Sequence, residues 1–144
     1  MIPKIIIVPI EYQRFTTIGD WYEDKYGNFT ISISYLYDWK YEFLVLIHEL
    51  TEWAICQSMG VKTQACDDFD GLWESEIKKG IQDINTEAGF DRRCPYRRGH
   101  VWGARMERLF CFLLRASWKD YCESCERAIK NYSNSKQSSS NASV

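Results

Sequence analysis

Apolar side chains change their spacing along the chain, and each spacing predicts a different kind of element. Residues 5–8 form a β-branched run between two prolines, which predicts a short first strand. Residues 29–35 alternate apolar and polar side chains with a period of two, and residues 19–23 precede them across a segment that contains Gly27 and Asn28. These two stretches predict a β-hairpin with one buried face.

Three later segments follow the helical period of 3.6 residues. Asp38 is a suitable N-cap and Gly60 a suitable C-terminal stop, so the first helix is predicted over residues 39–59. Its main apolar stripe consists of Phe43, Ile47, Leu50 and Ala54. A second helix is predicted over residues 66–79 and a third, long helix over residues 98–129. Residues 80–96 hold few apolar side chains, which predicts an irregular connection of a length that is often functional.

These elements predict a single α+β domain over residues 1–130, mostly helical, in which a short N-terminal antiparallel sheet packs on the helix 39–59. Residues 131–144 are rich in Ser and Asn without apolar periodicity, and they predict a disordered tail. A chain of 144 residues buries enough surface to fold without disulfides or a structural metal. We expect the six cysteines to be reduced thiols, and the Cys122-x-x-Cys125 pair is a weak metal signal because no second pair accompanies it.

Charge and hydropathy argue against two classes of partner. The 18 Lys and Arg residues against 20 Asp and Glu give a net charge of −2, which leaves no global electrostatic footprint for nucleic acid. No run approaches the roughly 18 uncharged apolar residues that a membrane span needs. The N-terminal apolar run is too short and interrupted for a signal peptide. We therefore expect a soluble protein with no membrane partner.

The strongest chemical signal is the sequence His48-Glu49-Leu50-Thr51-Glu52 at the centre of the most apolar helix. At the helical angle per residue, His48, Glu49 and Glu52 project within a sector of about 100°. The pattern differs from the zinc-binding His-Glu-x-x-His motif only in that Glu52 replaces the second histidine. A carboxylate can still bind zinc, and it also favours harder ions such as Mn, Fe, Mg or Ca.

The helix 98–129 carries a second His and Glu on its core-facing side. His100 and Glu107 are about 20° apart in azimuth and share their face with the small residue Gly103, which lets another helix come close. His48, Glu52, His100 and Glu107 therefore form a candidate set of metal ligands. The competing interpretation is a structural network of arginines and carboxylates, because Arg105 and Arg108 flank Glu107.

Two further groups are candidates for the lining of a pocket or for contacts with substrate. Asp70 and Glu74 are one turn apart on the predicted helix 66–79, and a solvated acidic face is the alternative interpretation. Arg97 and Arg98, with Arg92 and Arg93, place positive charge just before His100. Such a cluster suits an anionic group, and its alternative is a solvated loop.

Several short motifs stand in a fairly specific order and spacing between residues 19 and 114. They are the segment 41–52, Asp68-Phe69-Asp70, Trp73-Glu74, Cys94-Pro95-Tyr96, His100, Ala104 and Glu107-Arg108-Leu109. In this order the chain resembles a family of small proteins encoded by bacteriophages and prophages. The resemblance implies an accessory role in the host cytoplasm. The order of strand, hairpin and His-Glu helix is also loosely similar to the core of zincin metallopeptidases, in which an edge strand aligns a peptide, a role that residues 29–35 would take here.

The sequence thus predicts a zincin-like, metal-dependent hydrolase of a phage. A divalent ion, Zn or else Mn or Fe, is expected to bind His48, Glu52 and one or both of His100 and Glu107, with Glu49 accepting a proton from water. The substrate class is a peptide or another small hydrolysable molecule.

The alternative belongs to a different class: a non-catalytic phage accessory protein that binds a host protein, for example in host takeover or against host defence. Its binding surface would be the aromatic residues around the hairpin, because Tyr and Trp are enriched at binding hot spots. These residues are Trp21, Tyr22, Tyr26, Tyr35, Tyr37 and Trp39. A third, weaker hypothesis is a nucleotide or phosphate ligand held by Arg92, Arg93, Arg97 and Arg98.

Overall fold

Three strands precede four helices in the computed structural model, which describes residues 1–141 and their side chains as far as Ser135. In chain order the elements are β1 (Lys4–Val8), the 3-10 helix η1 (Ile10–Tyr12), β2 (Gly19–Glu23), β3 (Phe29–Ser34), α1 (Trp39–Met59), α2 (Thr63–Lys78), the 3-10 helix η2 (Ala88–Phe90), α3 (Arg97–Leu113) and α4 (Trp118–Asn141). The predicted α+β class is confirmed. None of the helices within residues 1–141 is long and apolar enough to cross a bilayer.

The sheet has the strand order β1-β3-β2 and is mixed. β2 and β3 form the predicted antiparallel hairpin, with Trp21 opposite Ile31, whereas β1 joins the other edge of β3 in parallel. The connection from β1 to β2 crosses β3, where the Gln13 side chain exchanges hydrogen bonds with Ser32 and Ser34. These bonds satisfy buried polar groups on that face of the sheet. The sheet is mixed, and not wholly antiparallel as expected from the sequence, because β1 enters it parallel to β3.

Helix α1 has the predicted bounds. The Asp38 side chain accepts a hydrogen bond from the backbone N–H of Lys40 at 2.8 Å, and Gly60 ends the helix with a left-handed φ of 69°. Its buried residues are Leu44, Val45, His48, Glu52 and Cys56. The predicted stripe at Phe43, Ile47, Leu50 and Ala54 is instead partly buried or exposed. The buried face of α1 is therefore the one that carries the polar residues.

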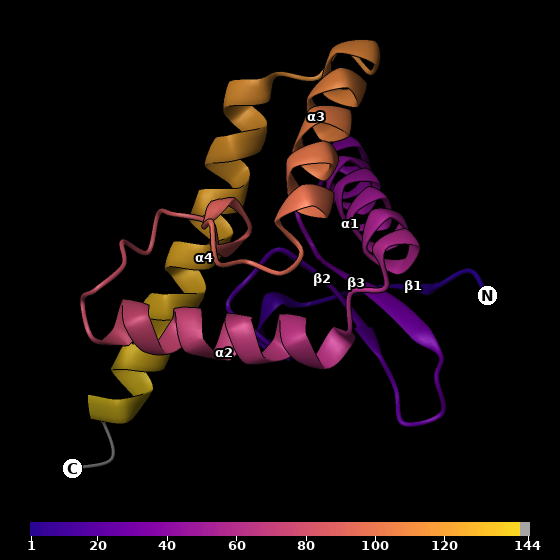
Figure 1. The fold of residues 1–144 in the computed structure, drawn as a ribbon. Coiled ribbons are helices and arrows are strands. Elements are labelled where there is room, and N and C mark those ends of the chain that lie inside the picture. Colours follow the sequence, from indigo (N-terminus) through magenta and orange to yellow (C-terminus); the bar gives the residue numbers. More distant parts are fainter. Residues whose placement is uncertain (142–144) are drawn as a thin grey trace.

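Two glycines set the distance between α1 and α3. A Cβ at Gly99 would lie 2.8 Å from the backbone oxygen of Glu52, and one at Gly103 would lie 2.9 Å from the backbone oxygen of His48. Larger residues at these positions would push the helices apart. Figure 1 shows α1 and α3 side by side, whereas α4 leaves the turn after α3 and diverges from it toward the lower left of the view.

The long helix predicted over residues 98–129 is wrong, because the chain breaks it after Leu113. Arg115 adopts a left-handed φ of 50°, and the backbone N–H of Ala116 donates to the carbonyl of Cys111 at 3.0 Å, which closes the helix in the manner usually reserved for glycine. Ser117 then accepts a hydrogen bond from the N–H of Asp120 and begins α4. The turn reverses the chain, so that Tyr121 of α4 reaches Glu107 of α3.

The remaining segments follow the sequence pattern more closely. Residues 80–96 are irregular apart from η2, as predicted, and all six cysteines are free. Helix α4 continues to Asn141, so the stretch 131–141, for which we expected disorder, is helical here. Residues 142–144 lie outside the described residues.

Candidate metal centre

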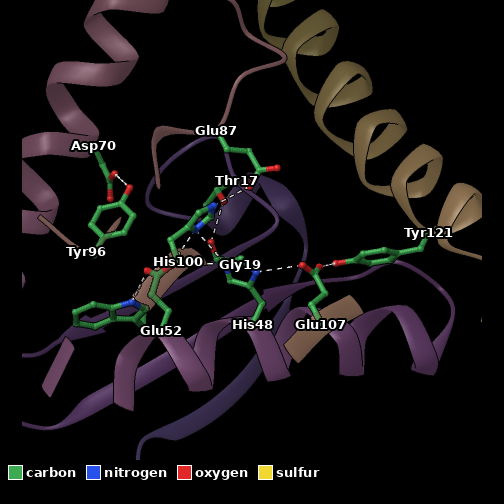
Figure 2. A network of polar contacts seen from close by, with 11 residues as sticks. Thr17, Gly19, His48, Glu52, Asp70, Glu87, Tyr96, His100, Glu107 and Tyr121 are labelled. Atoms are coloured by element: carbon green, nitrogen blue, oxygen red, sulfur yellow. Dashed lines mark hydrogen bonds and ion pairs between the residues drawn. The ribbon is translucent and has the colours of Figure 1, made fainter. Parts of the chain in front are cut away.

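Three buried side chains from α1 and α3 meet at one point between the helices (Figure 2). His48 and Glu52 lie one turn apart on α1, and His100 lies in the first turns of α3. The Nε2 atom of His48 is 3.0 Å from Nδ1 of His100 and 3.5 Å from Oε2 of Glu52, and His100 Nδ1 is 2.9 Å from the same carboxylate oxygen. The relative exposures of His48, Glu52 and His100 are only 8%, 5% and 8%.

Each histidine ring is also held at its outer nitrogen by a carboxylate. His48 Nδ1 lies 3.1 Å from Oε2 of Glu107, and His100 Nε2 lies 3.0 Å from Oε2 of Glu87. A carboxylate only accepts hydrogen bonds, so each outer nitrogen carries a proton. In a neutral ring the inner nitrogen then carries no proton. The lone pairs of the two inner nitrogens face each other and Glu52. Carboxylates that orient histidines in this way are typical of metal sites.

The spacing of the three inner atoms fits a divalent cation. All three lie within 4.8 Å of one another, and ligands around a tetrahedral zinc ion, at about 2.0 to 2.1 Å, are separated by about 3.3 Å. The observed separations of 2.9, 3.0 and 3.5 Å are close to this value. The buried group of His48, Glu52 and His100 can therefore hold a metal ion.

The other oxygens of the two buried carboxylates are also occupied. The indole N–H of Trp21, on β2, donates to Oε1 of Glu52 at 2.9 Å, which leaves Oε2 as the oxygen that faces the histidines. The hydroxyl of Tyr121, on α4, donates to Oε1 of Glu107. The sheet and α4 thus position the site from two sides.

The charges of the cluster stabilise one another. Burial opposes protonation of His100, but hydrogen bonds to Glu52 and Glu87 outweigh it and raise the pKa of His100 to about 9. Burial likewise opposes protonation of His48, and its bonds to Glu107 and Glu52 hold its pKa well above 6.5. Burial would raise the pKa of Glu52, yet the two histidines lower it to about 2. Without a metal, protons hold this cluster together.

Glu107, predicted as a fourth ligand, occupies a different position from the three converging residues. It lies on the far side of the His48 ring and contacts Nδ1, so it orients that ring. The neighbouring arginines stack on tryptophans instead. The guanidinium carbon of Arg105 lies 4.6 Å from the ring centroid of Trp102, and that of Arg108 lies 4.5 Å from the ring centroid of Trp118. The competing interpretation, a network of arginines around Glu107, finds no such ion pair among the described residues.

Glu49 lies next to the site but outside the three ligands. Its side chain packs against β2, where a Cβ on Gly19 would come within 2.6 Å of Glu49 Oε1. Burial, followed by repulsion from Glu52, raises the pKa of Glu49 well above its usual value. A carboxylate with a raised pKa suits a general base near neutral pH.

The predicted pocket residues are dispersed. Asp70 accepts a hydrogen bond from the hydroxyl of Tyr96, whose ring centroid lies 6.3 Å from that of His100. Glu74 instead accepts from the backbone N–H of Thr16 at 2.8 Å. Only Asp70 therefore lies close to the site.

The arginine cluster also separates in the structure. The Arg97 guanidinium donates to the carbonyl of Phe90, and Arg93 pairs with Glu76 and Asp91. Arg98 is exposed on α3. Arg93 and Arg97 therefore have different partners in the described part of the chain.

Sequence reasoning missed Trp21, Glu87 and Tyr121. Tyr121 becomes a neighbour of Glu107 only because the chain turns at Arg115, and the Ser117-x-x-Asp120 pattern was the available sign of a new helix start. Glu87 lies in the irregular segment, where the spacing of residues does not indicate the direction in which a side chain points.

Searches with this chain match no family model, no curated protein and no solved structure. Its function is therefore inferred from the geometry of the site.

Proposed function

We propose that the protein is a metal-dependent hydrolase whose divalent ion is held by His48, Glu52 and His100. The observation that carries this proposal is the pair of outer carboxylates, Glu107 and Glu87. They fix both rings so that two nitrogen lone pairs and one carboxylate oxygen point at the same position. Three protein ligands are also the number that catalytic zinc sites commonly use.

The residues divide the work of such a reaction. A divalent ion at this position would supply Lewis acidity. His48 and His100 keep their orientation through Glu107 and Glu87, and Trp21 holds Glu52 so that a single oxygen faces the ligand position. Glu49 is the proposed base, because it follows His48 on α1 and burial raises the pKa of its carboxyl well above the usual value.

For a peptide substrate, β2 is the better candidate for an aligning strand than residues 29–35. β3 is the central strand and is paired on both sides, so it has no free edge. β2 lies at an edge and carries both Trp21, which contacts Glu52, and Gly19, which packs on Glu49. The proposal retains the bacteriophage origin and host cytoplasm that the sequence resemblance implies.

Metal content tests the proposal first. Untagged protein purified without chelator, or reloaded with Zn, Mn or Fe, should contain about one equivalent of metal by mass spectrometry. The double variant His48→Ala, His100→Ala should lose it, and Glu74→Gln, a change at an acidic residue outside the site, should keep it. Absence of metal in the reloaded protein would refute the site.

Hydrolysis is tested separately on metal-loaded protein with peptide and ester substrates. Glu49→Gln should keep the metal and lose about a hundredfold or more in rate. A variant that retains the full rate would remove Glu49 as the base, and a loaded protein without turnover on any substrate would refute the hydrolase.

A second function, binding of a host protein, is favoured by one observation. Tyr37 is 96% exposed with a left-handed φ of 60°, and it stacks on Tyr35 beside the exposed Trp39. Trp21, by contrast, is buried, so it is not part of such a surface. Tyrosines and tryptophans in the open are typical of binding hot spots. A host protein captured with this chain would be purified, and its binding to the purified wild type and Tyr37→Ser variant would be compared. The variant should bind it more weakly, and unchanged affinity would refute this surface.

A further inference from the structure

Helix α3 carries an apolar stripe on the side that faces away from the candidate metal centre. Trp102, Met106, Leu109 and Leu113 follow the spacing i, i+4, i+7 and i+11. Trp102, Leu109 and Leu113 remain 44%, 48% and 57% exposed. At 100° per residue, Gly103 lies between the two groups around the axis of α3. The stripe is on one side of it, and His100 and Glu107 are on the other. This stripe is therefore not used by the core or by the site.

The stripe continues onto the neighbouring helix. Because Gly99 and Gly103 bring α3 against α1, the side chains on the outer flank of α1 border the same surface. Ile47 is partly buried there and Ala54 is exposed. We refer to the stripe on α3 and its border on α1 as the outer face. Single exposed apolar side chains are ordinary, but a row at helical spacing is typical of a helix face that packs against another helix.

The charge on the outer face is of one sign. Arg98 and Arg105 are exposed beside the stripe, and Arg98 has no ion pair among the described residues. The only acidic residue of α3, Glu107, points inward to His48 and Tyr121.

The acidic residues of α1 also point elsewhere. Glu42 accepts from the backbone N–H of Leu36, Glu49 packs on β2 and Glu52 belongs to the metal centre. The outer face is thus cationic although the whole chain has a net charge of −2.

This charge selects among the possible occupants. A second copy of the chain would bring its own Arg98 and Arg105 against the same arginines, which is unfavourable. Single-stranded nucleic acid is attracted to cations but gains most from aromatic stacking, and only Trp102 in the stripe is aromatic. An acidic protein segment satisfies both the apolar stripe and the arginines.

We propose that the outer face binds an acidic, amphipathic helix of another protein. Apolar residues of that helix would cover Trp102, Leu109 and Leu113, and its carboxylates would pair with Arg98 and Arg105. This inference is independent of the metal centre, because none of these five residues contacts the three ligands in the described part of the chain.

A synthetic helical peptide tests it directly. The probe is a fluorescent peptide with Leu at positions i, i+3, i+4 and i+7 and Glu at the other exposed positions, and its control carries Lys in place of Glu. In fluorescence anisotropy the Glu peptide should bind and the Lys peptide should bind at least about tenfold more weakly. The double variant Arg98→Glu, Arg105→Glu should reverse this order.

Matched variants separate charge from apolar contact. Leu109→Ser with Leu113→Ser should weaken the Glu peptide about tenfold or more, whereas Arg127→Glu, an exposed change on α4, should leave it unchanged. All these positions are exposed, so circular dichroism should show the same helix content. Equal binding of both peptides, binding of neither, self-association abolished by the leucine changes, or binding of single-stranded DNA in place of the peptide would each overturn the proposal.

Discussion

Without a bound metal ion, the stability of this protein should fall as the pH rises from 6.5 to 9. In the metal-free cluster His100 keeps its proton until a pKa of about 9, against 6.5 for a free histidine. Its ion pairs therefore stabilise the fold fully below pH 6.5, and that contribution disappears as the pH rises through 9. A shift of this size corresponds to about 3 kcal/mol. His48 changes stability in the same direction.

A bound divalent ion should oppose this loss. The ion requires both histidine rings to be neutral, so its apparent affinity rises by about tenfold per pH unit for each proton that it displaces. At a concentration one hundred times its dissociation constant, the ion adds about 2.7 kcal/mol to the free energy of unfolding. The metal-free and metal-loaded proteins should thus diverge in stability as the pH increases.

Thermal unfolding followed by circular dichroism measures both effects. One kcal/mol corresponds to about 3 °C in Tm for a domain of this size, so we expect the chelated protein to lose about 10 °C between pH 6.5 and 9. Zn, Mn or Fe should recover most of it. The double variant His48→Ala, His100→Ala removes the histidine contribution and should show neither the fall nor the recovery. An unchanged Tm in the chelated protein would refute the ion pairs, and no recovery with any ion would refute the metal centre.

Three other changes test the surroundings of the site. Tyr121→Phe removes the hydroxyl that holds Glu107 and should weaken metal binding by about tenfold, measured by competition with a chromophoric chelator. Asp70→Asn removes a carboxyl whose pKa burial raises to about 7, so in urea unfolding it should gain up to about 4 kcal/mol relative to the wild type at pH 8 and nothing at pH 4. Gly103→Ala places a Cβ 2.9 Å from an α1 carbonyl oxygen and should cost about 1 to 3 kcal/mol in the same assay.

Each of these changes has a contradicting result. Unaltered metal affinity in Tyr121→Phe would mean that α4 does not position the site. An Asp70→Asn gain that is the same at both pH values would mean that the charge of the carboxylate is not its cause. Full stability of Gly103→Ala would mean that α1 and α3 can separate freely.

Local patterns predicted those parts of the fold that depend on neighbours in the sequence. The period of two in residues 29–35 gave β3, and Asp38 with Gly60 bounded α1 correctly. Periodicity did not indicate which face of α1 points to the core, because this helix is apolar on nearly all sides. The polar residues His48 and Glu52 mark that face better than the apolar stripe.

Features that depend on distant parts of the chain were not predictable in this way. The parallel pairing of β1 with β3 follows from a crossover whose polar contacts come from Gln13. The helix break at Arg115 has neither Gly nor Pro to announce it, so Tyr121 could not be placed beside Glu107. His48, Glu52 and His100 were found because their residue types carry chemistry wherever the chain brings them together.

The separation of the ligands along the chain has a kinetic consequence. His100 is 52 residues from His48 and 48 from Glu52, so the ligand set exists only after α1 and α3 have docked. An ion that binds this late cannot assist the first encounter of the helices, and the folding rate should not depend on it. The ion would stabilise the native state through contacts that are absent from the folding transition state. It should therefore lower the unfolding rate.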